Sequence, residues 1–248
     1  MPLLEIKNVT KIYRTAKSSV EALKGVSLTI NKGEILGLLG VNGAGKTTLS
    51  SIVATLRPAT SGDIFFEGKS IYSDIAAYRY NIGFCPQKPN LNNYLSLREN
   101  LVFAGRYFGM SKEMIEARID ELAERFVLTQ YLDEKPEILS GGYKQRFTLA
   151  RSILHQPKLI ILDEPTVALD PHIRRQIWDY IKALKENNIS VLLTTHYLDE
   201  AEVLSDRVCV LDQGKVRIID TPANLMQSFQ KDRLEEVFIH LMTENKKE

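Results

Sequence analysis

Hydrophobic and polar residues alternate near the N-terminus in the pattern of a β-strand. Val26, Leu28 and Ile30 are separated by single polar residues, as in an antiparallel strand with one buried face. A late hairpin is predicted where apolar residues 208–211 and 216–219 flank a polar turn. Short, mainly apolar runs are typical of strands covered on both faces, and therefore of a parallel sheet. The chain has three such runs, at residues 34–39, 158–162 and 190–194.

Helical periodicity lies between these strand patterns. Apolar residues recur at intervals of three and four, which places them on one face of a helix. Two series do so: Ile115, Ile119, Leu122 and Phe126, and Ile173, Ile177, Ile181 and Leu184. Asp170 followed by Pro171 predicts the start of the second helix. Ser96 and Glu99 have the spacing of a capping box and predict another helix start.

These patterns suggest how the chain is organised. Residues 90–154 lack buried-strand runs and are predicted to be helical, whereas the strand patterns lie on either side of them. We therefore expect an α/β core made of residues 1–89 and 155–221, interrupted by a helical insert at 90–154. Residues 222–248 are predicted to form a C-terminal helical appendage.

Composition narrows the class of protein. The 248 residues are 44% hydrophobic and 25% charged, which is typical of a globular chain and not of a disordered one. Lys and Arg total 32 against 31 Asp and Glu, a net charge of +1, so we expect no nucleic-acid partner bound through overall basicity. Two cysteines, Cys85 and Cys209, cannot build a disulfide framework, and we expect them to be buried thiols in a reducing compartment. Without an apolar run of ~20 residues or a signal-peptide core, the chain is expected in the cytosol, held at a membrane only through a partner.

A glycine-rich segment provides the first candidate chemistry. Residues 40–47, GVNGAGKT, match the Walker A pattern between a predicted strand and a predicted helix. The glycines let backbone N–H groups curl toward phosphate oxygens, and the helix that follows directs its positive end at the anion. Lys46 adds a mobile positive charge, and the Thr47 hydroxyl can ligate Mg²⁺. The predicted nucleotide-binding residues are Gly40, Asn42, Gly43, Ala44, Gly45, Lys46, Thr47 and Thr48.

Two acidic residues end the apolar run that starts at Leu159. Asp163 and Glu164 follow this predicted buried strand directly. Ligands of open α/β sheets bind at the carboxyl ends of strands. Asp163 is suited to hold Mg²⁺, and Glu164 is suited to take a proton from an attacking water. An ordinary solvated strand end is the alternative, and the Walker A segment makes the functional interpretation the stronger one.

A second glycine-containing segment precedes a helical stretch at residues 147–154. Residues 139–146 read LSGGYKQR, in which Ser140 is a typical N-cap residue. Gly141 and Gly142 leave backbone amides open, so this helix start can also bind an anion. By itself the segment predicts no more than a capped helix, and its position shortly before Asp163 and Glu164 adds weight to the functional interpretation.

Taken in order along the chain, these motifs resemble the ATP-binding subunit of an ABC transporter. The resemblance covers nearly the whole chain and rests on Walker A, Walker B at residues 159–164, the signature at 139–142, and Gln87, Asp170 and His196. It implies a P-loop NTPase (RecA-like) α/β core with a mainly parallel sheet, an N-terminal antiparallel β subdomain and an inserted helical subdomain.

The resemblance also implies a role for each motif. Two ATP-binding domains pair head to tail around two ATP molecules, so the signature (Ser140, Gly141 and Gly142) of one copy contacts the γ-phosphate held by Lys46 of the other. The implied catalytic residues are Glu164, His196, Lys46 and Gln87.

Further roles follow from the same resemblance. His196 holds the γ-phosphate and orients the water, and Asp170 communicates across the dimer. Gln87 touches Mg²⁺, with Thr47 and Asp163 as the other metal residues, and senses the membrane subunit.

Tyr13 resembles the aromatic residue that stacks on adenine, although a strand aromatic packed on the core is the alternative. Two positions depart from the family pattern. Tyr143 stands where glutamine is common, and Val167 stands where serine is usual. These departures concern contacts across the dimer. Because Glu164 and His196 are both present, we expect a hydrolysis-competent site.

Three segments resemble the drug- and polysaccharide-export branch of the family: residues 84–91, 96–101 and 234–238. The expected partners are a second copy or a paralogous ATPase, and integral membrane permease subunits that hold the chain at the cytoplasmic face. The alternatives are a non-transport ABC-type ATPase and a regulatory module that binds ATP without cleaving it. The transported molecule does not follow from the sequence.

Overall fold

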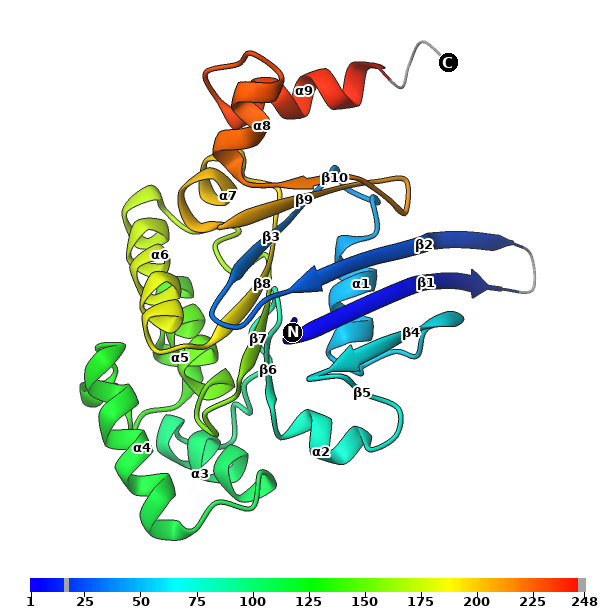
Figure 1. Ribbon diagram of the computed structural model, residues 1–248. Coiled ribbons are helices and arrows are strands. Elements are labelled where there is room, and N and C mark those ends of the chain that lie inside the picture. The colour runs from blue at the N-terminus through cyan, green and yellow to red at the C-terminus, as the bar shows by residue number, and fades with distance from the viewer. Residues whose placement is uncertain (16–17, 245–248) are drawn as a thin grey trace.

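The fold is built on two β-sheets, seen in a computed structural model that describes residues 1–15 and 18–244 (Figure 1). The smaller sheet has four strands in the order β2-β1-β4-β5, and the larger has six in the order β10-β9-β3-β8-β7-β6. The strands are β1 (Leu4–Arg14), β2 (Ser19–Ile30), β3 (Ile35–Leu39), β4 (Ser61–Phe66), β5 (Lys69–Ser70), β6 (Ile82–Cys85), β7 (Leu159–Asp163), β8 (Ser190–Thr195), β9 (Arg207–Asp212) and β10 (Lys215–Asp220).

The larger sheet is parallel except at one edge. Strands β9, β3, β8, β7 and β6 pair in parallel, and β10 pairs antiparallel with β9. The three apolar runs of the sequence are β3, β7 and β8, so the parallel sheet and the late hairpin are confirmed. The smaller sheet is antiparallel, and β2 contains the alternating residues Val26, Leu28 and Ile30 with their side chains buried.

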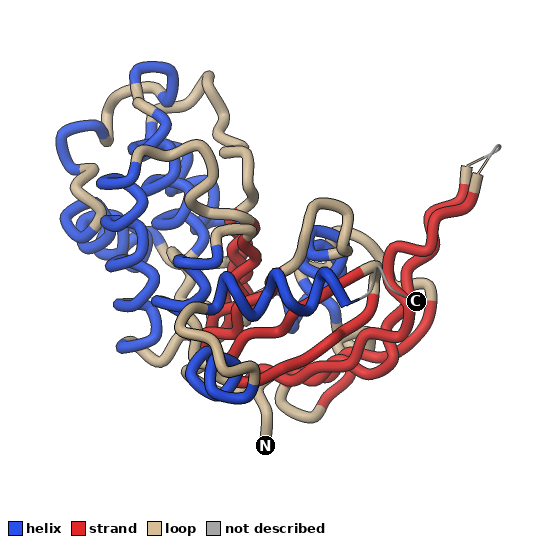
Figure 2. The backbone as a smooth tube through the Cα atoms, turned by 90° about the horizontal axis from the view of Figure 1, so that it is seen from above, coloured by secondary structure: helices blue, strands red, loops and turns tan. Residues whose placement is uncertain are grey.

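Helices pack against both faces of the parallel sheet. A group of helices also forms a lobe to one side of the strands (Figure 2). The helices are α1 (Lys46–Val53), α2 (Ile75–Arg79), α3 (Leu97–Tyr107), α4 (Lys112–Arg125), α5 (Gly141–Ser152), α6 (Pro171–Glu186), α7 (Leu198–Leu204), α8 (Pro222–Ser228) and α9 (Leu234–Glu244), with short 3₁₀ turns η1 (Thr129–Tyr131) and η2 (Pro136–Ile138). Because α3, α4 and α5 all lie within residues 90–154, that stretch is helical as predicted.

The predicted helix starts can be compared with the structure residue by residue. Ser96 and Glu99 form a complete capping box at the start of α3. Asp170 occupies the N-cap of α6 as predicted, but its carboxylate makes no cap hydrogen bond, and Pro171 supplies the first-turn geometry. On the apolar face of α6, Ile173 is only half-buried because it lies in the first turn, at the end of the packed face.

Alternating side chains of the parallel sheet enter two different cores. Leu159 and Ile161 of β7 join a cluster that fills the space between the two sheets around α1, whereas Ile160 and Leu162 join a cluster beneath α5 and α6. This two-sided burial explains why the first four residues of the strand are all apolar. Cys85 and Cys209 are both buried thiols, as expected.

The C-terminal helices have their own small cluster. Leu225 of α8 and Leu234 and Val237 of α9 pack with α7 and with the β9 side of the sheet. Residues 245–248 of the predicted appendage lie outside the described residues.

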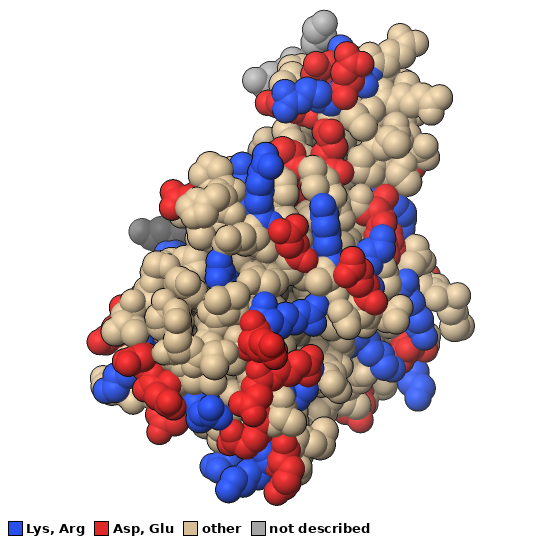
Figure 3. Space-filling view, turned by 90° about the vertical axis from the view of Figure 1, so that its left-hand side faces the viewer, with Lys and Arg blue, Asp and Glu red and all other residues tan. Residues whose placement is uncertain are grey.

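Charged side chains of both signs lie next to one another on the left-hand side of the molecule as Figure 1 draws it, the side on which α4 and α6 lie (Figure 3). In the part of the chain that the structure describes, no helix combines the length and the apolar character required to cross a bilayer.

Candidate functional site

The predicted site residues lie where parallel strands end. The glycine-rich loop follows β3, and Gln87 lies two residues beyond β6. Asp163 is the last residue of β7 and Glu164 comes directly after it, while His196 directly follows β8. Because these four strands are neighbours in one parallel sheet, their carboxyl ends meet at one edge.

The loop that follows β3 needs its glycines for two different reasons. Gly43 and Gly45 have φ of 83° and 111°, in the region that side chains with a Cβ avoid. A Cβ on Gly40 would lie 2.4 Å from the carbonyl oxygen of Leu211, closer than two such atoms can approach. The loop is also fixed from behind, since a backbone N–H of the β9–β10 turn donates to the Ala44 carbonyl at 3.0 Å.

Lys46, the first residue of α1, turns its ammonium back over the loop. Its Nζ donates to the carbonyl oxygens of Gly40 at 2.7 Å and Val41 at 3.3 Å, and lies 3.9 Å from a Glu164 carboxylate oxygen. Burial lowers the pKa of Lys46, and the charges of Glu164 and Asp163 oppose that shift. The buried ammonium group therefore lies among oxygen atoms. A bound phosphate group would also surround it with oxygen atoms.

Asp163 is held by two hydroxyl groups. Thr194 Oγ1 donates to its Oδ1 at 2.7 Å, and Thr47 Oγ1 donates to the same atom at 3.4 Å. Burial raises the pKa of Asp163, and the hydrogen bond from Thr194 opposes the rise. Sequence reasoning missed Thr194, although a threonine directly after the apolar residues of the strand, two residues before His196, was a usable signal.

The donor set around Asp163 fits Mg²⁺. Thr47 and Asp163, which are joined by a hydrogen bond, offer a hydroxyl and a carboxylate oxygen, the hard ligands that Mg²⁺ prefers. Gln87 can add an amide oxygen, since its amide nitrogen is the atom that donates to Glu164. Within the described residues, no group of three or more His, Cys, Asp or Glu side chains could hold a metal. Mg²⁺ usually keeps several water molecules or phosphate oxygens among its ligands, so a site with few protein ligands suits it.

Three side chains from different strand ends meet at Glu164. Gln87 Nε2 donates to Glu164 Oε2 at 2.8 Å, and His196 Nδ1 lies 3.2 Å from the same oxygen. Lys46 approaches the other carboxylate oxygen. Glu164 also has φ of 50°, a strained conformation for a residue with a side chain, and such strain is concentrated at functional sites.

Other predicted residues lie apart from this cluster. Ser140 caps α5, its hydroxyl accepting from the Tyr143 N–H at 3.5 Å, and it is exposed together with Gly141 and Asp170. The Tyr13 ring faces the charged groups of two neighbouring basic residues at 5.3 and 5.7 Å. Among the described residues, no hydrogen bond or ion pair joins Ser140, Gly141, Gly142, Asp170 or Tyr13 to residues 40–48.

Comparison with known proteins decides the family. The sequence profile described as ABC transporter matches residues 23–167. The chain belongs to the ABC transporter family. The Nod factor export ATP-binding protein I of Rhizobium meliloti is 42% identical over 212 residues, which are 86% of this chain and 62% of that protein. The linearmycin resistance ATP-binding protein LnrL of Bacillus subtilis (strain 168) is 37% identical over 232 residues, 94% of this chain and 73% of that protein.

Solved structures of ABC proteins share the whole fold. The ATP-binding subunit of an ABC transporter superposes with a TM-score of 0.86 at 29% identity, over 97% of this chain and 99% of that one. A dimeric post-hydrolysis state of the ATP-binding cassette MJ0796, bound to ADP and phosphate, has a TM-score of 0.81 at 30% identity over 88% of this chain and 98% of that one. The predicted P-loop NTPase fold is confirmed. The chain spans 62% of the length of the Nod factor export relative.

The structure shows where one departure from the ABC family pattern lies. The Tyr143 ring packs edge-on against Tyr131, with centroids 4.7 Å apart, and the guanidinium of Arg146 lies 4.9 Å from its centre. The aromatic side chain is therefore held within the helical lobe.

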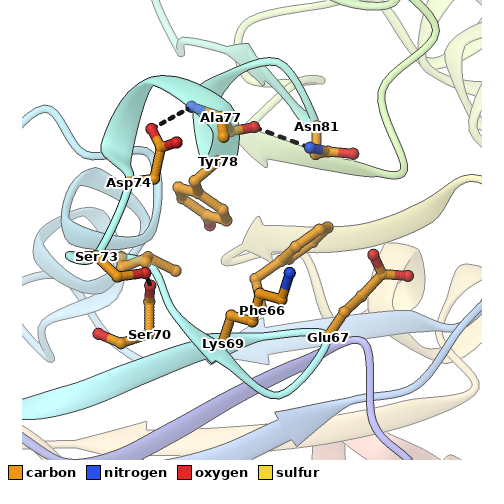
Figure 4. A pocket seen from close by; sticks show the side chains of 10 residues that line it. Phe66, Glu67, Lys69, Ser70, Ser73, Asp74, Ala77, Tyr78 and Asn81 are labelled. Carbon is orange, nitrogen blue, oxygen red and sulfur yellow. Dashed lines mark hydrogen bonds between the residues drawn. The ribbon is translucent and has the colours of Figure 1, made fainter.

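A separate cavity of about 360 Å³ lies between the β4–β5 hairpin and α2 (Figure 4). Phe66 and Tyr78 line it with rings 5.3 Å apart, while Asp74 accepts from the Ala77 N–H and Asn81 donates to the Ala77 carbonyl. These hydrogen bonds are local to α2, and the cavity shares no residue with the ABC nucleotide motifs.

Proposed function

We propose that this chain is the ATP-binding and ATP-hydrolysing subunit of an ABC export system and powers transport through separate membrane subunits. The observation that carries the proposal is the meeting of Gln87, His196 and Lys46 at the Glu164 carboxylate, beside the glycine-rich loop. A triphosphate on that loop would place its last phosphoryl group among these side chains.

The loop and Lys46 fit a triphosphate. The positive φ at Gly43 and Gly45 lets backbone N–H groups turn toward phosphate oxygens, and the missing Cβ at Gly40 lets the loop lie close against β9. The start of α1 adds its positive end. Thr47, Asp163 and Gln87 would hold Mg²⁺, which neutralises phosphate charge when bound.

Glu164 is the proposed general base. Its carboxylate takes a proton from the attacking water, a contribution typically worth ~10²–10⁴-fold in rate. Gln87 and His196 hold one carboxylate oxygen in place and leave the other facing Lys46. Positioning and charge stabilisation supply most of the acceleration in phosphoryl transfer.

We assign to the exposed residues Ser140, Gly141 and Asp170 the contacts with a second copy of the chain or with a paralogous ATPase. A Cβ on Gly141 would meet open space, so the start of α5 has room for an anion presented by another molecule. Two of the similar solved structures are described as dimeric. We assign Tyr13 to stacking on adenine, flanked by the positive charges of Lys11 and Arg57.

A groove beside strand β6 suits the membrane subunit. It has a volume of about 390 Å³, lies between the core and the helical lobe, and is lined by Leu56, Phe84, Tyr107 and His155 among others. Leu56 and Tyr107 are 60% and 65% exposed, which leaves apolar surface for a partner to cover. Docking there would keep the chain at the cytoplasmic face of the membrane. The export direction is supported by the relatives named for Nod factor export and linearmycin resistance.

Glu164→Gln tests the function. The amide keeps the shape of the side chain but cannot accept the proton, so we expect ATP binding to persist and hydrolysis to fall by ~10²-fold or more. Fluorescent-nucleotide titration, phosphate release and size-exclusion chromatography measure binding, turnover and accumulation of a nucleotide-bound dimer. Turnover of the variant at the wild-type rate would show that Glu164 is not the base, and absence of ATP hydrolysis by the wild-type protein would refute the function itself.

A further inference from the structure

Glu200 is a carboxylate on α7 that is completely shielded from solvent. Its exposed fraction is 0%, although the two other acidic residues of α7 are not buried. Glu200 Oε1 accepts hydrogen bonds from Thr166 Oγ1 at 2.7 Å and from Trp178 Nε1 at 2.8 Å. None of the functional motifs includes this residue.

The partners of Glu200 come from segments that contain the proposed functional residues. Thr166 lies two residues after Glu164, and Trp178 is on α6, which begins directly after Asp170. Glu200 itself is on α7, four residues after His196. One oxygen atom therefore joins the loop of the proposed base, the helix behind the dimer-facing loop and the helix behind the proposed switch histidine. The two helices, α6 and α7, lie next to one another (Figure 1).

A second set of contacts connects the same two helices. Arg174 of α6 forms an ion pair with Asp199 at 3.3 Å, and its guanidinium lies 4.8 Å from the centre of the Tyr197 ring. The Tyr197 ring in turn lies 4.3 Å from the His196 ring. The orientation of the His196 segment therefore depends on α6 through the contacts of Arg174 with Asp199 and with the Tyr197 ring.

Stability alone is a poor explanation for this carboxylate. Burial raises the pKa of Glu200, so the ionised form is costly here even though hydrogen bonds from Thr195, Thr166 and Trp178 oppose the shift. Replacing buried charged groups with well-packed apolar residues is often neutral or stabilising. Among the described residues the second carboxylate oxygen, Oε2, is buried without a hydrogen-bond partner, which adds to the cost. A buried polar group kept at such a cost can serve to fix the arrangement of the elements that its bonded oxygen joins.

We propose that Glu200 is a positioning residue for hydrolysis, which fixes the segment after β8 against the loop after β7 so that His196 meets Glu164. The proposal rests on the proposed function, since it concerns the same reaction. His196 Nδ1 lies 3.2 Å from Glu164 Oε2, and loosening either segment would change that contact. Misplacement of a catalytic group by about 1 Å can cost ~10²-fold in rate.

The first test compares three variants with the wild-type protein in steady-state ATP hydrolysis. Glu200→Ala removes the acceptor, and we expect kcat to fall by about 10- to 100-fold with little change in the KM for ATP. Glu200→Gln keeps an oxygen acceptor for Thr166 and Trp178 and should restore most of kcat. Glu202→Ala is the matched control, because Glu202 lies on the same helix but accepts from the Leu234 N–H of α9 at 3.0 Å, and its kcat should stay at the wild-type value.

The second test uses the single tryptophan of the chain. Trp178 donates directly to Glu200, so its emission reports on the contact without any substitution. Adding Mg²⁺ and ATP to the wild-type protein should shift Trp178 emission, and Glu200→Ala should remove the shift. Combining Glu200→Ala with His196→Ala should slow hydrolysis no further than His196→Ala does, because both act through one contact.

The outcomes separate the two proposals. If the wild-type protein hydrolyses ATP and Glu200→Ala keeps wild-type kcat, or loses it only as much as Glu202→Ala does, the positioning role is wrong and the proposed function stands. Additive losses in the double variant also overturn the role. If the wild-type protein does not hydrolyse ATP, the proposed function fails and the positioning role fails with it.

Discussion

At the residue scale, the glycine-rich loop shows how the absence of a Cβ atom at a glycine decides the local structure. Gly40 is limited by space, since a Cβ there would lie 2.4 Å from a backbone oxygen that cannot move without disturbing β9. Gly43 is limited by its φ of 83° instead, and a Cβ there would meet nothing within 4 Å. The same residue type therefore serves two purposes within one loop.

This difference predicts the effect of Gly40→Ala. We expect the free energy of unfolding to fall by about 1–3 kcal/mol, the usual cost of forcing extra atoms into a packed site. Gly141→Ala is the control, because a Cβ there has open space and no positive φ is required, and it should stay within about 0.5 kcal/mol of the wild-type value. Urea unfolding measures both. Equal stabilities of the two variants would mean that the close approach at Gly40 does not exist in solution.

At the element scale, the joint between the helical lobe and the core contains a half-buried histidine. His155 stacks on Phe108 at the end of α3 with ring centroids 3.6 Å apart, and its Nε2 donates to the Ile82 carbonyl of β6 at 2.9 Å. Burial lowers the pKa of His155 to about 4. The imidazole is therefore neutral in the folded protein at neutral pH.

The lowered pKa predicts that this joint is sensitive to acid. The unfolded chain takes up the proton near pH 6.5, before the folded protein does, so stability is full above that pH and is lost as the pH falls toward 4. The loss reaches up to about 3 kcal/mol. His155→Gln cannot take up the proton and can still donate to Ile82, so the stability gap between the wild-type protein and the variant should shrink from pH 7 to pH 4. A gap that stays constant across this range would contradict the shift.

Sequence patterns predicted the strand ends well because their signals are local. The apolar runs of β3 and β7 are followed by the residues that carry the chemistry, so the pattern itself places Lys46 and Glu164 after the carboxyl ends of strands, whereas His196 after β8 was predicted from the resemblance to the ABC family. Glu200 could not be found in this way. It lies in an acidic stretch beside Asp199 and Glu202, and only the packing of α6 over α7 buries one of the three. Strand β6 and helix α2 were also missed, because four or five residues show too little periodicity.

At the scale of the whole molecule, a single copy brings only part of the proposed site together. Lys46, Asp163, Glu164, Gln87 and His196 are neighbours at one edge of the sheet, and the start of α5 is exposed in the helical lobe. A helix N-terminus favours an anion wherever it is presented, whether by the same chain or by another. If α5 takes part in hydrolysis, the phosphate must be brought to it by a second molecule.

This requirement makes dimerisation testable through a pair of N-cap serines. Ser140 caps α5 and Ser111 caps α4 in the same way, each hydroxyl accepting from a backbone N–H three residues on, so Ser→Arg at either position costs about 1 kcal/mol of capping. In the Glu164→Gln background, Ser140→Arg should abolish the ATP-dependent dimer seen by size-exclusion chromatography, because the longer side chain fills the space that the second copy's phosphate needs. Ser111→Arg should leave the dimer intact, since no motif implicates α4 in the interface. If both double variants dimerise as well as Glu164→Gln alone, the start of α5 lies outside the contact, and the two halves of the proposed site do not meet.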